Sequence, residues 1–323
     1  MRKTLFILLS LLISSVSLAQ YPLLTDKQGT FEILSRTDYV GYDCGYTKAE
    51  VSTNLQRIIE LINVVRKNPV IAGNKGFDGR ARIYNLNCKY PGGYGIPSRI
   101  SFEFASWYKL KDGSPARGLI EPPEWSIYIN QAIPGWGASY GHDAKKGYFT
   151  RPLRKKTVAK GIDVYDGEWF VIYDPSRPPY WIPVTINEAF AAVREFAKNE
   201  KDEIAAKFQN EFIEKEWTEI PAEYRDKPAY FGGGISRVTH KPGYESQDSI
   251  FPLIVKVNPE YWNRELPRSA IQIINLHSIQ NKEYLRKLKE EYLEKNSISY
   301  NALRFEEEFD QDDIRNLVPL IGK

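Results

Sequence analysis

Hydrophobic residues recur at helical spacing in the segment from residue 48 to residue 67. Thr47 and Glu50 form a capping box at the start of this segment, in which each side chain satisfies a free backbone N–H group. Asn68-Pro69 then predicts the end of the helix. The apolar positions on the shared face are Val51, Leu55, Ile58, Ile59, Ile62 and Val65. Their period of about 3.6 residues predicts an amphipathic helix.

The same pattern predicts helices later in the chain. Thr185 and Glu188 form a second capping box, followed by apolar residues at steps of three or four over residues 186–217. We expect one long helix there, with the polar segment 199–203 as a bend. The other predicted helices are residues 281–295 and a short segment that Asp310 caps.

Strict alternation of apolar and polar or small residues predicts strands between the helices. Ile100, Phe102 and Phe104 alternate with Ser101, Glu103 and Ala105, which is typical of a half-buried strand. Asp166-Gly167 separates two apolar runs and favours a tight hairpin turn. The other segments predicted as strands are residues 81–86, 125–129, 251–257, 270–276 and 300–305.

Short strands, a hairpin and interspersed helices favour an α+β fold with antiparallel sheets covered by amphipathic helices. The two capping-box helices suggest two modules, residues 20–178 and 179–323, divided at Pro178-Pro179. No repeat at the level of single residues supports this division.

The first nineteen residues have the pattern of a secretory signal peptide. Arg2 and Lys3 precede a short apolar run, and Ser17 and Ala19 place small residues before Gln20. We therefore expect export to the periplasm or the extracellular space. The absence of an Asn-X-Ser/Thr sequon favours a bacterial route. No later segment is apolar over the roughly 20 residues that a membrane span needs.

Export makes a disulfide between Cys44 and Cys88 the favoured interpretation of the two cysteines, and two separate buried thiols are the alternative.

Without the predicted signal peptide the net charge is close to neutral, which argues against nucleic acid as a partner. The basic stretch from Lys145 to Lys160 is interpreted as a solvated loop. The three histidines lie far apart and no metal-ligand spacing is present, so we expect neither a metal nor a cofactor.

Catalytic motifs are weak. Gly137-Ala138-Ser139-Tyr140-Gly141 matches the nucleophile elbow of serine hydrolases, but no strand leads into it and no helix pattern follows. Glycoside hydrolysis needs two carboxyl groups across a sugar, and sequence alone cannot say which acids converge. The acids considered for this role are Glu121, Glu124, Asp163, Asp166 and Glu168. An acidic run from Glu306 to Asp313 lacks the spacing of an EF-hand and is interpreted as a solvated helix start.

Aromatic residues are abundant, with 7 Trp, 21 Tyr and 15 Phe, and many fall in turns rich in proline and glycine. The residues selected as ligand contacts are Tyr94, Trp136, Tyr140, Tyr180, Trp181 and Trp262. Such rings either form a binding surface for a protein, peptide or glycan, or fold back onto the core. The favoured hypothesis is an exported binding protein, and the alternative is a secreted hydrolase of glycans or of ester or peptide bonds.

Overall fold

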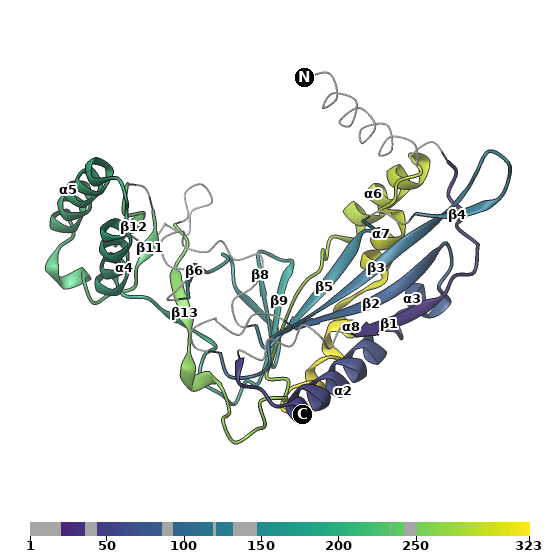
Figure 1. Ribbon diagram of the computed structural model, residues 1–323, viewed down its shortest axis with the longest axis horizontal. Coiled ribbons are helices and arrows are strands. Elements are labelled where there is room, and N and C mark those ends of the chain that lie inside the picture. The colour runs from purple at the N-terminus through teal and green to yellow at the C-terminus, as the bar shows by residue number, and fades with distance from the viewer. Residues whose placement is uncertain are drawn as a thin grey trace.

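The computed structural model describes residues 21–35, 44–85, 93–118, 121–131, 147–232, 234–241 and 251–323. It has the predicted α+β architecture (Figure 1). The strands are β1 (Phe31–Ser35), β2 (Phe77–Asn85), β3 (Ser98–Lys109), β4 (Pro115–Arg117), β5 (Glu124–Ile129), β6 (Tyr148–Thr150), β7 (Lys156–Ala159), β8 (Ile162–Tyr165), β9 (Trp169–Tyr173), β10 (Trp181–Pro183), β11 (Tyr230–Phe231), β12 (Val238–Thr239), β13 (Ile254–Val257) and β14 (Ile273–His277). The α-helices are α2 (Lys48–Val65), α3 (Pro69–Gly73), α4 (Ile186–Lys198), α5 (Glu203–Glu219), α6 (Lys282–Glu294), α7 (Tyr300–Glu308) and α8 (Gln311–Arg315), and the 3-10 helices are η4 (Ala222–Tyr224), η5 (Pro259–Tyr261) and η6 (Val318–Leu320).

A nine-stranded sheet forms the centre of the protein, in the order β1-β2-β3-β5-β14-β9-β8-β7 with β4 paired to β3. Its neighbouring strands are antiparallel except for the parallel pair β1 and β2. Strand β14 lies between β5 and β9, where Leu276 is opposite both Ile127 and Phe170. Segments from both sides of the predicted boundary at residue 178 therefore share one sheet, and the division into two modules stays a prediction.

Helices α2, α3, α7 and α8 cover one face of this sheet and enclose the largest apolar core. Ile58 of α2 and Phe305 of α7 are fully buried there against alternate residues of the strands. The opposite face is polar along β2, β3 and β5. Arg82 makes two hydrogen bonds to Glu103 on this face, at 2.7 and 3.1 Å. The two faces thus follow the period-2 alternation of the strands.

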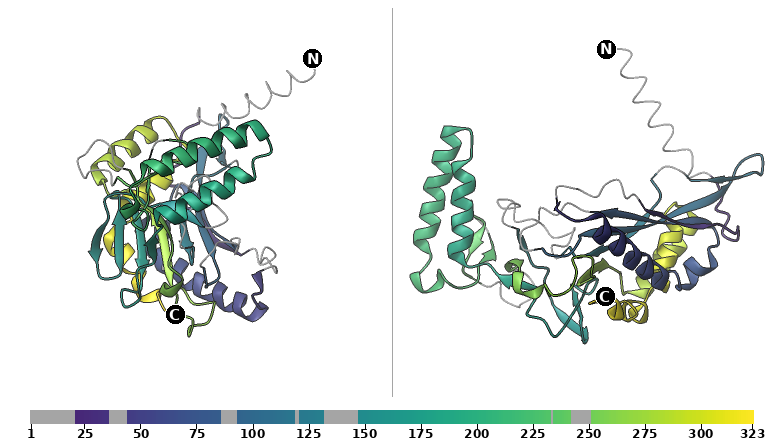
Figure 2. Two further views of the ribbon diagram at one scale, coloured as in Figure 1. Left: turned by 90° about the vertical axis from the view of Figure 1, so that its left-hand side faces the viewer. Right: turned by 60° about the horizontal axis from the view of Figure 1, so that its bottom comes forward.

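A second, three-stranded sheet in the order β10-β13-β6 packs over the β8, β9 and β14 part of the central sheet. Alternation along β13 directs Val255 toward the central sheet and Ile254 toward helices α4 and α5. The small sheet is therefore buried on both faces. Figure 2 shows the α4–α5 hairpin projecting beyond the sheets.

The local helix and turn signals are confirmed. Thr47 Oγ1 accepts from the Glu50 N–H group at 3.2 Å, and Thr185 Oγ1 accepts from the Glu188 N–H group at the same distance. The turn between β8 and β9 contains Asp166-Gly167, with φ angles of 54° and 84°. Both residues adopt the left-handed region that this tight hairpin turn requires.

Two predictions are wrong. The single helix over residues 186–217 is broken at residues 199–202, and Asp202 begins α5 by accepting hydrogen bonds from Ile204 and Ala205. The chain reverses there because a strong cap stops one helix and starts another. The predicted strand at residues 300–305 is the helix α7. An apolar run this short fits the periodicity of a strand as well as that of a helix. In the folded protein the helix buries Phe305 in the core.

Within the described ranges, no helix is both long and apolar enough to cross a bilayer.

Candidate functional site

Four of the six aromatic residues selected from sequence gather between the two sheets. Tyr180, Trp181 and Trp262 belong to one aromatic cluster, with exposed fractions of 4%, 7% and 2%. Tyr94 packs at its edge, where its hydroxyl donates to the carbonyl oxygens of Arg264 and Leu266 at 3.1 and 3.0 Å. These rings therefore build a core, and they reach a ligand only where a cavity opens beside them.

Other selected residues lie outside the described ranges. Trp136 and Tyr140 fall there, together with Ser139 of the motif that resembles a nucleophile elbow. Cys44 is described and Cys88 is not, so their pairing stays a prediction.

One cavity opens between the two sheets, with a volume of about 360 Å³, and is called the inter-sheet cavity. Tyr180 and Trp181 line it, so two of the selected aromatic residues reach a cavity wall. Its other lining residues are Arg151, Lys155, Tyr165, Tyr173, Pro175, Arg177, Pro179, Pro183, Leu253 and Val255. Its volume lies at the small end of the range for small-molecule sites.

A buried carboxylate, Asp163 of β8, organises the tyrosines of this cavity. Asp163 has no exposed surface and accepts hydrogen bonds from the Tyr180 hydroxyl at 2.6 Å and the Thr157 hydroxyl at 2.7 Å. The Tyr165 and Tyr180 hydroxyls are 2.7 Å apart. Burial is the main cause that raises the pKa of Tyr180 far above its usual value, and that of Tyr173 to about 12. The tyrosines therefore stay neutral and keep their rings in place.

Three cationic side chains line the same cavity. Lys155 Nζ is 2.7 Å from Asp163 Oδ2, so this pair is neutral. Arg177 donates to the carbonyl oxygens of Glu260, Tyr261 and Trp262 at 3.0–3.1 Å. Arg151 Nε is buried and has no hydrogen-bond partner among the described residues. A buried donor without a partner costs about 1–3 kcal/mol, so Arg151 is the group that a bound acceptor would stabilise most.

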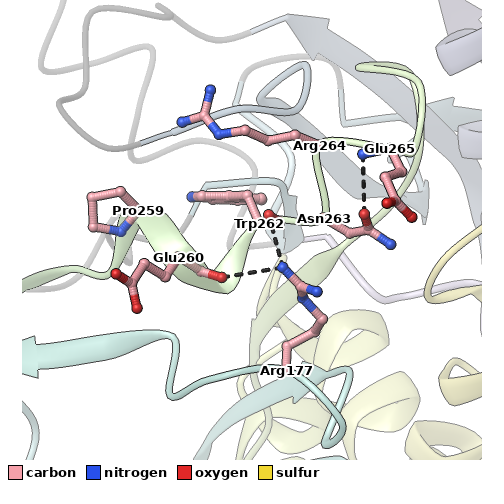
Figure 3. Close-up of a pocket in the computed structure, with 7 residues that line it drawn as sticks. All are labelled: Arg177, Pro259, Glu260, Trp262, Asn263, Arg264 and Glu265. Atoms are coloured by element: carbon pink, nitrogen blue, oxygen red, sulfur yellow. Dashed lines mark hydrogen bonds between the residues drawn. The ribbon is translucent and has the colours of Figure 1, made fainter.

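A second, open cavity of about 610 Å³ lies under the loop that begins at Pro259 (Figure 3). Trp262 lines it, and Arg177 reaches into the loop to bind its carbonyl groups. Arg177 also lines the inter-sheet cavity, so one guanidinium supports both. Because its Nε and Nη2 groups donate to backbone oxygens, we interpret Arg177 as a structural clamp of the loop.

A third cavity, of about 350 Å³, opens where β14 ends and where β5 and β9 begin, beside α7, and is called the sheet-end cavity. His277 lies in it with Trp169 packed on its ring, at 4.2 Å between centroids. Its Nε2 is 3.4 Å from Glu168 Oε2 and its Nδ1 is 3.9 Å from Glu306 Oε1. Burial lowers the pKa of His277 and raises the pKa of Glu306. This cavity thus collects acids that are distant in sequence.

These acids do not form a metal site. Glu168 and Glu306 approach different ring nitrogens of His277, so the three groups cannot converge on one ion. No group of three or more potential ligands suited to a metal ion occurs in the described part of the chain.

Sequence reasoning missed several residues of these cavities. Arg151 and Lys155 lie in the basic stretch that is interpreted from sequence as a solvated loop, and no sequence signal placed them at a cavity. Glu306 lies in the acidic run that was interpreted as a helix start, although its side chain is only 15% exposed. No sequence signal indicated that α7 directs this residue toward His277.

The chain matches no protein-family model, no curated protein and no solved structure.

Proposed function

We propose that this protein is a binding protein whose inter-sheet cavity takes a small acid carried on a six-membered ring. The observation that carries the proposal is the buried Arg151 Nε, which lacks a partner among the described residues beside four aromatic side chains. A carboxylate or sulfate would accept its hydrogen bond, and a charge-assisted bond of this kind is stronger than a neutral one.

The charge of the cavity supports an anion. Its lining contains Arg151, Lys155 and Arg177 and no acidic residue among the described ones. Asp163 lies behind the tyrosines and neutralises only Lys155. Two positive charges therefore remain, in surroundings where burial strengthens their attraction for a ligand.

The shape of the cavity supports a ring. The cavity has flat aromatic walls, and the tyrosine hydroxyl groups are held by hydrogen bonds inside the protein. The wall residues are Tyr165, Tyr173, Tyr180 and Trp181. Aromatic faces pack well against the apolar face of a sugar or of another aromatic ring. The volume of about 360 Å³ suits a single ring with its acid group.

The test is titration of the purified chain with sodium benzoate and with sodium glucuronate, followed by calorimetry. Benzyl alcohol and glucose are the uncharged counterparts. We expect saturable binding of an acid and much weaker binding of its counterpart. Benzoate and glucuronate distinguish an aromatic acid from an acidic sugar. Equal binding of charged and uncharged rings, or no binding of either acid, would contradict the proposal.

Arg151→Gln and Arg154→Gln form a matched pair for the same titration. Arg151 lines the cavity, whereas Arg154 is 76% exposed and pairs with Asp166 outside the lining. We expect Arg151→Gln to weaken binding at least about tenfold, which corresponds to about 1.4 kcal/mol. Arg154→Gln should bind as the wild type does. A comparable loss in both variants would show that general surface charge, not the cavity, attracts the anion.

Export is part of the proposal, because residues 1–19 have the pattern of a signal peptide. Sequencing of the N-terminus after expression in a bacterium tests it. A chain that starts at Gln20 in the periplasm or medium is expected, and a chain that keeps Met1 in the cytosol is the opposing result.

A further inference from the structure

The sheet-end cavity and the inter-sheet cavity are similar in volume, about 350 and 360 Å³, but they differ in the charge of their walls. The inter-sheet cavity has three cationic lining residues, whereas no Lys or Arg is among the described residues that line the sheet-end cavity. Its charged lining residues are Glu124 and Glu306. The two cavities share no lining residue. The sheet-end cavity therefore favours a positive ligand over a negative one.

Glu306 is the acid of this cavity that lacks a strong cationic partner in the described part of the chain. Its side chain is 15% exposed, and its ion-pair contact there is His277 Nδ1 at 3.9 Å. Lys282 donates instead to the backbone oxygens of Glu306 and Phe309, at 3.1 and 2.8 Å. Burial is the main cause that raises the pKa of Glu306, and the Ile279 N–H group and Lys282 oppose the rise. A cation in the cavity would therefore stabilise this carboxylate.

Glu124 has its partners already. Arg99 Nη2 forms an ion pair with Glu124 Oε1, and the Ser101 hydroxyl donates to Glu124 Oε2 at 2.5 Å. The Glu124 side chain is 45% exposed, so water also reaches it. Arg99 thus neutralises Glu124, and the charge that a ligand would meet in this cavity comes from Glu306.

His277 adds no positive charge that would repel a cation. Burial is the main cause that lowers the pKa of His277, so its imidazole is neutral at pH 7. Its Nε2 atom is 3.4 Å from Glu168 Oε2, and the Trp169 ring packs on it with 4.2 Å between centroids. These two contacts fix the imidazole as an uncharged part of the wall.

Three aromatic side chains complete the walls, and the faces of such rings attract cations. Trp125 is only 6% exposed, and its Nε1–H group donates to the His277 carbonyl oxygen at 2.6 Å, so its ring is fixed. The Arg99 guanidinium lies 5.9 Å from the centre of the Tyr128 ring, which shows that this ring is accessible to a cation. Trp169 is the third aromatic residue. Walls of this kind contact methyl and methylene groups, which a metal ion does not carry.

We infer that the sheet-end cavity binds a small organic ammonium ion, with its positive charge beside Glu306 and its methyl or methylene groups against the aromatic walls. Aromatic rings combined with an acid recognise such ions through cation–π attraction and charge. The volume of about 350 Å³ lies at the small end of the range for small-molecule sites, which suits a ligand of few atoms. This site is separate from the inter-sheet cavity and takes a ligand of opposite charge.

The experiment is calorimetric titration of the full chain with choline chloride and with butylammonium chloride, at a constant concentration of sodium chloride. The uncharged counterparts are dimethylbutanol, in which carbon replaces the choline nitrogen, and butanol. We expect saturable binding of at least one ammonium ion, at least about tenfold tighter than that of its counterpart. Choline and butylammonium distinguish a methylated from a primary ammonium group. Binding of neither ion, or equal binding of charged and uncharged forms, overturns the inference.

Glu306→Gln and Glu308→Gln form a matched pair of variants on α7. Glu306 lines the cavity, whereas Glu308 is exposed outside the lining. Glu306→Gln should weaken binding of the ammonium ion at least about tenfold and leave the weak binding of the uncharged alcohol unchanged, because the aromatic walls remain. Glu308→Gln should bind as the wild type does. Wild-type affinity of Glu306→Gln, or an equal loss in both variants, contradicts the inference.

Trp169 tests the contribution of the walls. Trp169→Leu keeps an apolar side chain but removes the aromatic face, so it should weaken binding of the ammonium ion about two- to fivefold. Trp169→Phe keeps an aromatic ring and should retain most of the affinity. Circular dichroism of both variants checks that the sheet is intact. Equal affinities of the Leu and Phe variants would show that the ring faces do not attract the ion.

This test is independent of the proposed function. The benzoate and glucuronate titrations report on the inter-sheet cavity, and the ammonium titrations report on a cavity with different lining residues. Binding of choline without binding of either acid would contradict the proposed function alone. Binding of an acid without binding of either ammonium ion would overturn this inference alone.

Discussion

Arg268 and Glu50, 218 positions apart in the chain, form a two-pronged ion pair. Arg268 Nε donates to Glu50 Oε1 at 2.8 Å, and Arg268 Nη2 donates to Glu50 Oε2 at 2.9 Å. Glu50 is also the acid of the capping box that begins α2, so the pair ties this helix to the loop before β14. The same contact secures two elements that enclose the main core.

This pair should make stability depend on pH under acidic conditions. The hydrogen bonds from Arg268 are the largest cause that lowers the pKa of Glu50 to about 2. A lowered folded-state pKa contributes stability above the unfolded pKa of about 4.5, and this stability is lost as the pH falls toward 2. Arg268→Gln should lower the free energy of unfolding at pH 7 by about 0.5–1 kcal/mol, a value limited by solvent screening.

Urea unfolding at pH 7 and at pH 3 checks this prediction. The deficit of Arg268→Gln relative to the wild type should shrink at pH 3, because Glu50 begins to be protonated in both chains. Arg194→Gln, which removes a similar pair with Glu214 on the exposed hairpin, is the control. An equal deficit at both pH values would mean that Arg268 acts through packing alone.

The buried Asp163 predicts a second stability effect. Asp163→Asn removes the charge that balances Lys155 and weakens the bond from the Tyr180 hydroxyl. Lys155 is 40% exposed, so water screens the charge that remains, and the loss of the acceptor for buried hydroxyl donors should cost about 1–3 kcal/mol. Tyr180→Phe removes one hydrogen bond and should cost about 1–2 kcal/mol. Tyr284→Phe, at an exposed position, should leave the urea midpoint unchanged.

The structural features that could be predicted from sequence are local ones. The capping boxes at Thr47 and Thr185 and the turn at Asp166-Gly167 depend on residues within four positions of one another. Each therefore appears in the sequence as a short pattern. The α+β class followed from the order of such patterns, and the structure confirms it.

The cavities depend on contacts that no local pattern contains. Glu124 of β5, His277 of β14 and Glu306 of α7 line one cavity although they are far apart in the chain. Strand order and register decide this, and both depend on pairings far apart in sequence. For the same reason the aromatic residues Tyr180 and Trp262 could be selected from sequence, but sequence could not decide between a binding surface and rings that fold back onto the core, as they do here.

Phe305 gives the third prediction, because the segment that contains it was expected to be a strand. Its ring is fully buried and lies 5.1 Å from the Trp125 ring and 5.4 Å from the Phe104 ring, measured between centroids. Phe305→Ala should cost about 3–5 kcal/mol, since it leaves a cavity in the main core. Phe208→Ala, at a position that is 54% exposed, should change stability by less than about 0.5 kcal/mol. Thermal unfolding of both variants decides the matter, and similar losses would contradict the packing of α7.

Glu306 predicts an effect of opposite sign to that of Glu50. Burial raises its folded-state pKa, so the native protein holds this proton longer than the unfolded chain does. Stability is then fully present below the unfolded pKa of about 4.5 and is lost as the pH rises through the folded-state value. Glu306→Gln keeps a neutral group of the same size, so it should be more stable than the wild type at pH 7 and equal to it near pH 4.

His277 has the opposite effect on the pH dependence of stability. Burial lowers its pKa in the folded protein, so the unfolded chain binds more protons when the pH falls below about 6.5, the usual pKa of histidine. Comparing Glu306→Gln with Glu308→Gln by urea unfolding from pH 4 to pH 8 isolates the contribution of Glu306, since His277 is present in both. A stabilised Glu306→Gln at pH 7 would show that the cavity keeps a buried acid at the expense of stability. A destabilised Glu306→Gln at pH 7 would show that charge partners stabilise the ionised Glu306, and it would contradict the raised pKa.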